Sequence, residues 1–145
     1  MAADPIAIAS DHGGFELKAV LVAELKSAGI PVIDLGTMGP ESVDYPDFAD
    51  ALAKAIADGK AARGVLLCGT GIGVSMVANR HRGIRAAVCR DVTDARLARQ
   101  HNDANVLCLG GRVTGSEVAK DCLRTFLSTE FEGGGRHTRR LAKFN

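Results

Sequence analysis

Short runs rich in Val, Ile and Leu alternate along the chain with longer segments in which apolar side chains recur every three or four residues. The short runs predict five strands, at residues 5–9, 30–35, 64–68, 85–89 and 106–109. The longer segments predict helices at 15–28, 46–58, 91–101 and 116–127, and one more that follows a glycine loop and ends near residue 80. The run 64–68 is almost entirely apolar, which is typical of a strand covered on both faces.

Strands and helices in this alternation indicate right-handed crossovers and a parallel sheet with helices on both faces. We therefore predict an α/β fold, a Rossmann-like three-layer αβα sandwich with a five-stranded parallel sheet. A polar, glycine-rich link at 130–135 leads into a basic segment, which predicts a C-terminal helical extension. The length of 145 residues fits a single domain over residues 1–145.

Composition removes several classes of protein and partner. The chain is 46% hydrophobic and 24% charged, which excludes intrinsic disorder. A net charge of +1 gives no electrostatic reason to expect a nucleic-acid or membrane partner, and aromatic residues, at 4% with no Trp, are few for base stacking. The chain shows no signal-peptide pattern and no Cys-x-x-Cys pair. We expect a cytoplasmic protein that binds neither nucleic acid nor membrane.

Reactive side chains follow four of the predicted strands. Asp11 and His12 follow the first, Cys68 ends the third, and two further groups follow the fourth and fifth: Arg90-Asp91 and Gly110-Gly111-Arg112. In open α/β sheets, ligands bind beyond the carboxyl ends of the strands. We therefore predict one ligand site at this edge, and we place His12 and His101, which precedes Asn102, in loops that face the ligand.

The loop Gly69–Gly73 has glycine at every second position and precedes a helix. It is either a site where backbone N–H groups meet a phosphate or a developing oxyanion, or a tight turn that needs glycine. Its third glycine comes too early for a dinucleotide fingerprint, and it lacks the Lys of a Walker loop. Cys68, directly before it, is either a reactive thiol beside backbone donors or a small buried hydrophobe.

Two other candidate sites are weaker. A metal site formed by Asp11, His12 and His101 lacks helix-face spacing such as His-x-x-x-His, so we expect no metal. In the basic tail, Arg136 and Arg140 lie on one face if the segment is helical, and two guanidiniums there can clamp a phosphate. The alternative is a solvated basic helix.

Seven stretches of the chain stand out together: residues 9–14 (Ala-Ser-Asp-His-Gly-Gly), 44–47 (Asp-Tyr-Pro-Asp), 68–73 (Cys-Gly-Thr-Gly-Ile-Gly), 83–87 (Gly-Ile-Arg-Ala-Ala), 99–107 (Arg-Gln-His-Asn-Asp-Ala-Asn-Val-Leu), 110–112 (Gly-Gly-Arg) and 135–137 (Gly-Arg-His). In these stretches the sequence resembles the type B ribose-5-phosphate isomerases, within a wider family that includes galactose-6-phosphate isomerase subunits. The resemblance covers nearly the whole chain, from Ile6 to Lys143.

The resemblance implies an aldose–ketose isomerisation of a phosphosugar through a cis-enediolate, without a metal or organic cofactor. For the chemistry it implies that Cys68 is the base, that His101 and Thr70 open the furanose ring, and that Asp11 handles hydroxyl protons. One branch of the family has a carboxylate base where this chain has Val74, which favours the thiol here.

For binding, the resemblance implies three groups of ligands to the substrate. These are the backbone N–H groups of Gly69, Gly71 and Gly73 for the enediolate, Tyr45 and Asn102 for the sugar, and His12, Arg112, Arg136 and Arg140 for the phosphate. It also implies a homodimer or homotetramer whose active sites combine two chains.

Our leading hypothesis is therefore an isomerase of ribose 5-phosphate and ribulose 5-phosphate. A close alternative is the same chemistry on another phosphosugar, such as allose 6-phosphate, galactose 6-phosphate or a four-carbon phosphosugar. A non-catalytic phosphate-binding module would keep the glycine loop and the arginines but tolerate the loss of Cys68 and His101. A thiol redox protein is disfavoured because no resolving cysteine accompanies Cys68.

Overall fold

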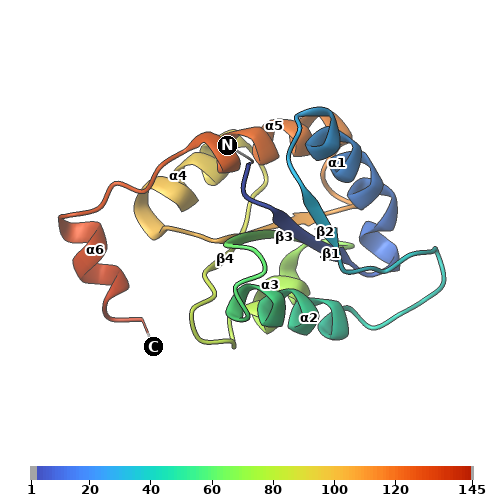
Figure 1. Cartoon of the computed structure of the whole chain (residues 1–145), viewed down its shortest axis with the longest axis horizontal. Coiled ribbons are helices and arrows are strands. Elements are labelled where there is room, and N and C mark those ends of the chain that lie inside the picture. Colours follow the sequence, from blue (N-terminus) through green and yellow to red (C-terminus); the bar gives the residue numbers. More distant parts are fainter. Residues whose placement is uncertain (1–2, 145) are drawn as a thin grey trace.

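A computed structural model describes residues 3–144 and contains one five-stranded parallel sheet (Figure 1). Its strands are β1 (Ile6–Ser10), β2 (Val32–Asp34), β3 (Arg63–Cys68), β4 (Ala86–Val88) and β5 (Val106–Gly110), in the order β2-β1-β3-β5-β4. The helices are α1 (Phe15–Ser27), α2 (Tyr45–Ala57), α3 (Ile72–Ala78), α4 (Val92–Asn102), α5 (Ser116–Ser128) and α6 (Arg136–Leu141), with a short 3-10 helix η1 (His12–Gly14) after β1.

Helices cover both faces of the sheet, as the alternation of elements predicts. In Figure 1, α1, α4 and α5 lie above the sheet, and α2 and α3 lie below it. Leu21, Leu107 and Phe126 belong to the core on the first side, while Leu52 and Leu66 belong to the core on the second. The three central strands are buried on both faces, which explains their nearly continuous apolar sequences.

The observed elements follow the predicted ones closely, with differences at the edges of the sheet. β2 and β4 are three residues long, shorter than predicted, and both are half-buried. They are the outer strands of the sheet. Each pairs with only one neighbouring strand, so fewer inter-strand hydrogen bonds hold further residues at their ends in the strand. α3 ends at Ala78, two residues before its predicted end. Within the described residues, no helix is long and apolar enough to cross a bilayer.

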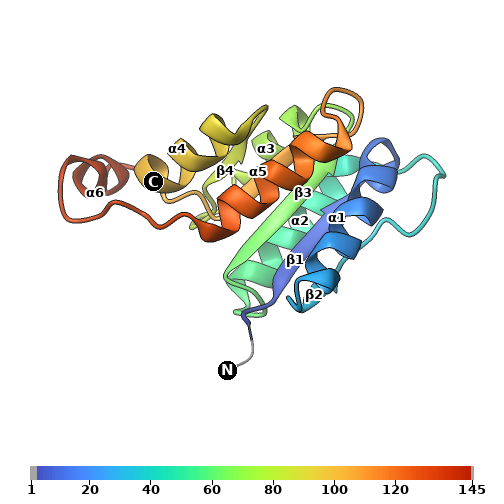
Figure 2. The same ribbon diagram turned by 90° about the horizontal axis from the view of Figure 1, so that it is seen from above.

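The predicted C-terminal extension is present and stands apart from the sheet. An extended segment leaves α5 and carries α6 past the end of α4, as Figures 1 and 2 both show. Three contacts hold this arm to α4: Nε of Arg99 donates to the main-chain oxygen of Thr129 at 3.1 Å, the main-chain N–H of Glu132 donates to the oxygen of Gln100 at 3.0 Å, and His137 stacks on His101. We call residues 129–144 the C-terminal arm.

Candidate active site

Cys68 is the last residue of β3 and is 5% exposed. Its Sγ accepts a hydrogen bond of 3.1 Å from the N–H of Gly71, because the loop after β3 turns back over the strand end. That turn needs glycine at position 71, where φ is 82° and a Cβ would lie 3.0 Å from the main chain of Leu109. The sulfur therefore lies at the carboxyl edge of the sheet with a main-chain donor aimed at it.

The other main-chain N–H groups of this loop differ in whether they donate a hydrogen bond within the chain. The N–H of Ile72 donates to Oγ1 of Thr70 at 3.1 Å. The N–H groups of Gly69, Thr70 and Gly73 donate to no residue in the part of the chain that the structure describes. Such unpartnered donors next to a thiol suit an oxygen that becomes negatively charged. Gly71 differs from its predicted role, because its N–H is directed at the sulfur of Cys68.

Asp11 and His12 lie beside this loop, on the turn that follows β1. Oδ1 of Asp11 caps η1 by accepting from the N–H groups of Gly13 and Gly14, at 2.9 and 3.2 Å. Nδ1 of His12 accepts from the N–H of Val43 at 3.1 Å, so in the neutral ring the proton is on Nε2. The bond to Val43 also holds the loop between β2 and α2 against the site.

Tyr45 and Arg112 form two walls of the same edge. The Tyr45 ring packs on Gly73 so closely that a Cβ there would lie 2.6 Å from Cε1. Arg112 donates its main-chain N–H to the oxygen of Gly69 at 2.9 Å, and its side chain runs over Gly69. The structure thus brings together the residues that the sequence places at the ends of β1, β3 and β5, along with Tyr45.

The structure corrects the predicted position of His101 and Asn102. They form the last turn of α4, which begins at the carboxyl edge after β4 and ends just before β5 begins. Eleven residues of helix span about 16 Å, so these two residues lie at the amino edge of the sheet. Cys68 pairs with Gly110 at the opposite end of β5. His101 therefore cannot reach the thiol of its own chain, a placement that the direction of a crossover helix already implies.

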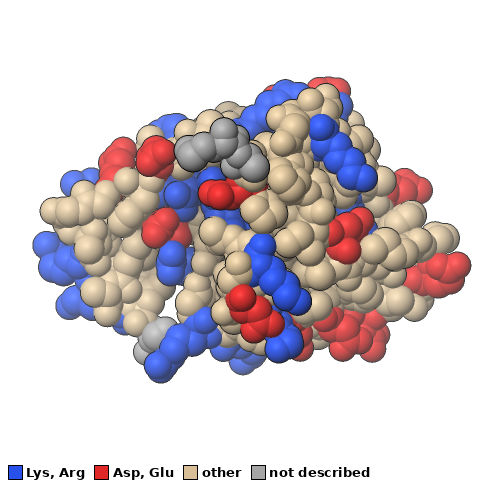
Figure 3. Space-filling model, viewed as in Figure 1, with Lys and Arg blue, Asp and Glu red and all other residues tan. Residues whose placement is uncertain are grey.

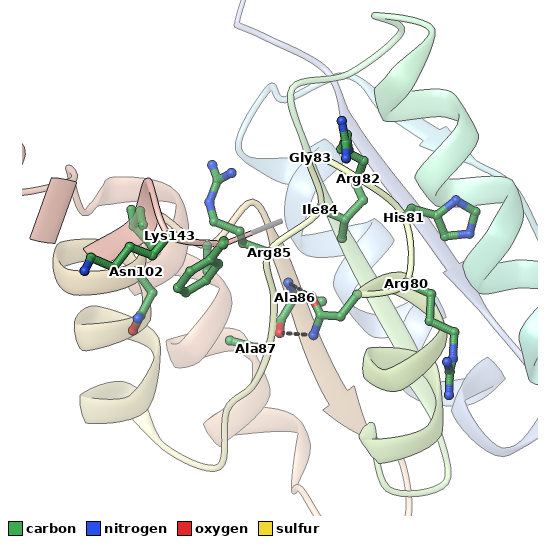
Figure 4. Close-up of a pocket in the computed structure, with 14 residues that line it drawn as sticks. Arg80, His81, Arg82, Gly83, Ile84, Arg85, Ala86, Ala87, Asn102 and Lys143 are labelled. Carbon is green, nitrogen blue, oxygen red and sulfur yellow. Dashed lines mark hydrogen bonds between the residues drawn. The ribbon is translucent and has the colours of Figure 1, made fainter. Parts of the chain in front are cut away.

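A cleft of about 1160 Å³ lies at this second location, between the C-terminal arm and the segment 79–87 (Figure 4). Asn102 lines it, together with four cationic side chains: Arg80, Arg82, Arg85 and Lys143. Figure 3 shows many Lys and Arg side chains of this face around α6 and along the lower edge beside it. This cleft is thus basic and lies away from Cys68.

Arg136 and Arg140 are exposed on α6, four residues apart and hence on one face of the helix, as predicted. They belong to the arm and lie with His101 and Asn102, not with Cys68. The predicted site residues therefore form two groups in one chain. The first group, at the carboxyl edge, contains Asp11, His12, Tyr45, Cys68–Gly73 and Arg112; the second, at the arm, contains His101, Asn102, Arg136 and Arg140.

This separation also rules out, within one chain, the metal site considered from the sequence, because Asp11 and His12 are in one group and His101 is in the other. A different set, His101, Glu132 and His137, places its ligand atoms within 4.8 Å of one another. The two imidazoles are stacked, with ring centroids 4.3 Å apart and planes 16° apart. Imidazole binds a metal in its ring plane, and near-parallel stacked planes do not converge on one ion.

The stack gives the arm a pH dependence. Burial lowers the pKa of His137 from its ordinary value of 6.5, and positive charge on His101 and Arg136 lowers it further. A lowered pKa means that docking favours neutral His137, so docking is complete above pH 6.5 and weakens as the pH falls through the lowered value. We expect amide protection of the arm, corrected for intrinsic exchange, to fall as the pH is lowered from 6.5 through this value, while protection of α5 does not.

His137→Phe is the matched control, because it keeps a ring on His101 and removes the titrating group. Its arm should hold its protection over the same pH range. If wild type and His137→Phe lose arm protection in parallel, titration of His137 does not control docking.

Sequence reasoning missed two contacts at the carboxyl edge. One is the hydrogen bond from Val43 to His12, which joins segments 31 residues apart. The other is a 2.7 Å hydrogen bond from Nη1 of Arg90 to the main-chain oxygen of Thr70. The position of Arg90, immediately after β4, was the signal that pointed to this edge; Val43 gave no comparable signal.

Several known proteins are similar to this chain in sequence and in fold. Residues 6–144 match the sequence profile of a family described as Ribose/Galactose Isomerase. The chain is 48% identical to ribose-5-phosphate isomerase B of Escherichia coli over 136 residues, which cover 94% of this chain and 91% of that protein. It is also 48% identical to D-erythrulose-4-phosphate isomerase of Pectobacterium atrosepticum, over 90% of this chain and 86% of that protein.

Solved structures show the same fold at similar identity. A ribose 5-phosphate isomerase from Thermotoga maritima superposes with a TM-score of 0.95 at 54% identity, over 97% of both chains. Ribose-5-phosphate isomerase B of Clostridium thermocellum gives a TM-score of 0.94 at 52% identity, over 96% of this chain and 93% of that one. The α/β three-layer fold predicted from the sequence is confirmed.

Proposed function

Because the chain belongs to the Ribose/Galactose Isomerase family and is an isomerase, we propose that it interconverts D-ribose 5-phosphate and D-ribulose 5-phosphate. The observation that carries the proposal is the position of the Cys68 sulfur, at the end of β3 beside the free N–H groups of Gly69 and Gly73. The substrate in the names of the relatives from E. coli and T. maritima supports this choice of sugar.

Cys68 acts as the base that moves a proton between adjacent carbons. The thiolate takes the proton from C2 of the open-chain aldose, and the electrons of that C–H bond move toward the C1 carbonyl to give a cis-enediolate. The hydroxyl proton on O2 passes to O1, and the thiol returns its proton to C1, which leaves a carbonyl at C2. Asp11 carries the hydroxyl proton, because its Oδ1 is occupied by two N–H groups and Oδ2 has no partner among the described residues.

The loop after β3 lowers the activation barrier by donating hydrogen bonds to the enediolate oxygen as that oxygen becomes negatively charged. The N–H groups of Gly69 and Gly73 are already fixed by the turn, so they need no rearrangement when the enediolate oxygen becomes negative. A preorganised donor of this kind typically contributes about 3 kcal/mol to the transition state. A positioned base contributes a further factor of about 10² to 10⁴.

His101 opens the furanose ring together with Thr70, and it does so at the thiol of another chain. Since α4 carries His101 to the amino edge, only a second copy can bring this imidazole to Cys68. The enzyme is therefore at least a homodimer, in which each arm reaches across to the partner. The exposed, basic arm and the large cleft beside it are suited to such an exchange.

The phosphate is held from both copies. His12, whose Nε2 carries the free proton, and Arg112, which lies over Gly69, come from the chain that supplies the thiol. Arg136 and Arg140 come from the second copy, where both are exposed on α6. Gripping the phosphate at a distance from the reacting carbons fixes C1 and C2 against the thiol. Between these two ends, the sugar is lined by Tyr45 of the chain that supplies the thiol and by Asn102 of the second copy.

We also place the enzyme in the cytoplasm. Cys68, Cys89, Cys108 and Cys122 are all free thiols. Buried free thiols of this kind fit a reducing compartment.

A four-carbon phosphosugar is the second candidate substrate, because the relative from P. atrosepticum named for erythrulose 4-phosphate matches this chain at the same 48% identity as the ribose-5-phosphate isomerase from E. coli. The two substrates share the reacting carbons and differ in the distance from those carbons to the phosphate. Discrimination therefore depends on how far the arginines of the arm lie from Cys68 in the assembled enzyme.

Turnover of a panel of phosphosugars tests the proposal. Ribose 5-phosphate, erythrulose 4-phosphate, allose 6-phosphate and galactose 6-phosphate are each assayed by initial rates, with and without chelator. We expect ribose 5-phosphate to give a kcat/KM at least about tenfold above the others. We expect no change with chelator. Preference for erythrulose 4-phosphate supports the four-carbon reading, loss of activity with chelator contradicts a cofactor-free mechanism, and binding of the panel without turnover indicates a phosphate-binding module.

A further inference from the structure

Arg90 joins the start of α4 to the glycine loop that follows Cys68. Its Nη1 donates a 2.7 Å hydrogen bond to the main-chain oxygen of Thr70. The main chain of Arg90 is itself held, because its N–H donates to Oδ2 of Asp94 in the first turn of α4, at 3.0 Å. The guanidinium of Arg90, whose own main chain is held in place, therefore binds one main-chain oxygen of the loop.

The carbonyl that Arg90 holds belongs to the peptide unit whose other end faces the sulfur. In a planar trans peptide, the C=O and N–H bonds point in opposite directions. The oxygen of the Thr70–Gly71 unit accepts from Arg90, and its N–H donates to Sγ of Cys68 at 3.1 Å. Arg90, one peptide unit and the thiol thus form a continuous line of hydrogen bonds.

A guanidinium at the oxygen end of this peptide strengthens the donor at the other end. Hydrogen bonds to charged groups are stronger than neutral ones, and bonds in a chain strengthen one another by about 10–30%. A stronger N–H donor favours a negatively charged sulfur over a neutral one. Arg90 therefore acts in the direction that stabilises the thiolate form of Cys68.

The same bond sets the orientation of the peptide. Gly71 has a φ of 82°, and glycine lets a neighbouring peptide plane rotate at little steric cost. A side chain at position 71 cannot restrict that rotation, because its Cβ would meet the main chain of Leu109. The hydrogen bond from Arg90 fixes the oxygen end of this peptide from outside the loop, in addition to the packing of Thr70 on Gly110, and so keeps the Gly71 N–H directed at the sulfur.

We propose that Arg90 is a positioning residue for the isomerisation, which holds the Thr70–Gly71 peptide so that the Gly71 N–H supports the thiolate of Cys68. The proposal rests on the proposed role of Cys68 as the base. Arg90 acts through the peptide and needs no contact with the thiol or the sugar.

Other groups around the thiol act independently of Arg90. Asp11 on the turn after β1 and Arg112 after β5 are the charged side chains of this chain against the loop. α2 contributes the Tyr45 phenol, and β5 contributes Cys108, whose pKa is raised by burial and by charge on Cys89 and Cys68. α3 has no charged side chain. Substitution of Arg90 leaves all of these groups in place.

Arg90→Met tests the proposal, with Arg96→Met as the matched control. Arg96 is an exposed arginine of α4 that donates to the side chain of Gln100, so its loss changes the net charge equally without touching the loop. The first measurement is the ultraviolet titration of the Cys68 thiolate in substrate-free enzyme, taken as the difference from the same variant carrying Cys68→Ser. The other thiols do not interfere, because burial raises the pKa of Cys89 to about 12 and that of Cys122 to about 11.

We expect the titration midpoint of Arg90→Met to lie about half a unit to one unit above that of wild type and of Arg96→Met. The acid limb of its kcat profile should move by the same amount, so that kcat at neutral pH falls about 3- to 10-fold with little change in KM. Arg90→Lys, which keeps the cation, should recover part of both effects.

An unmoved thiolate midpoint in Arg90→Met overturns the proposal, whether or not turnover falls. A rise in KM with unchanged kcat also overturns it, because that result makes Arg90 a substrate ligand. The titration needs no substrate, so it remains decisive even if Cys68→Ala retains activity and the proposed base is wrong.

Discussion

Cys68→Ala should lower kcat for ribose 5-phosphate by about 10² to 10⁴ and leave KM within a few-fold of wild type. The loop amides and the phosphate ligands remain in place, so binding persists while proton abstraction has no base. Val74, the neighbouring position where one branch of the family has a carboxylate, is fully buried and aliphatic and offers no substitute. Initial rates in both directions measure the loss, and the chemistry predicts the same large factor in each.

Two further variants sharpen this result. Cys68→Ser keeps the shape of the side chain but replaces the thiol with a far weaker acid, so its kcat should lie close to that of Cys68→Ala. Cys122→Ala is the matched control: it removes a buried thiol on α5 that lies in the core, and it should change stability without a comparable loss of kcat. Near-normal turnover by Cys68→Ala refutes the thiol base.

Mixing two inactive variants should restore activity if the active site is shared. Cys68→Ala lacks the base, and His101→Asn lacks the ring-opening imidazole. In a mixed dimer, one site combines the intact Cys68 of one copy with the intact His101 of the other, while the second site carries both substitutions. Random exchange of subunits in an equal mixture should therefore recover about a quarter of wild-type activity on ribose 5-phosphate.

The structure supplies the reason to expect this recovery. α4 holds His101 at the opposite edge of the sheet from Cys68, so a single chain cannot assemble both groups. The double variant Cys68→Ala/His101→Asn mixed with wild type is the control, because its mixed dimers contain no site with both groups intact. Absence of recovery after verified subunit exchange contradicts the shared site, and so does a sedimentation result showing an active monomer.

Much of the first half of the site follows from sequence alone, for a simple geometric reason. Asp11, Cys68 and Arg112 each follow a strand of a parallel sheet, and parallel strands present their carboxyl ends at one edge. The glycine spacing of the loop after Cys68 likewise predicts a turn with exposed amides, and that turn is present. The limits of α4 and α5 also follow from the sequence, within about two residues.

The edge of the sheet at which His101 lies was predicted wrongly from the sequence. Its polar neighbours suggested a loop at the ligand edge, whereas it is the penultimate residue of a crossover helix. Which edge a helix end reaches depends on the direction of the whole crossover, and that direction is a property of the sheet rather than of the neighbouring residues.

The sequence by itself determined the order of strands and helices along the chain, the edge at which Cys68 lies and the glycine turn that follows it, because these depend on periodicity and on local turn chemistry. Only the tertiary structure decided that Arg90 meets Thr70, that His12 holds Val43, and that His101 stacks on His137. Each of these contacts joins segments 20 or more residues apart in the chain. Such contacts are set by the packing of helices on the sheet, and no local pattern of residues records them.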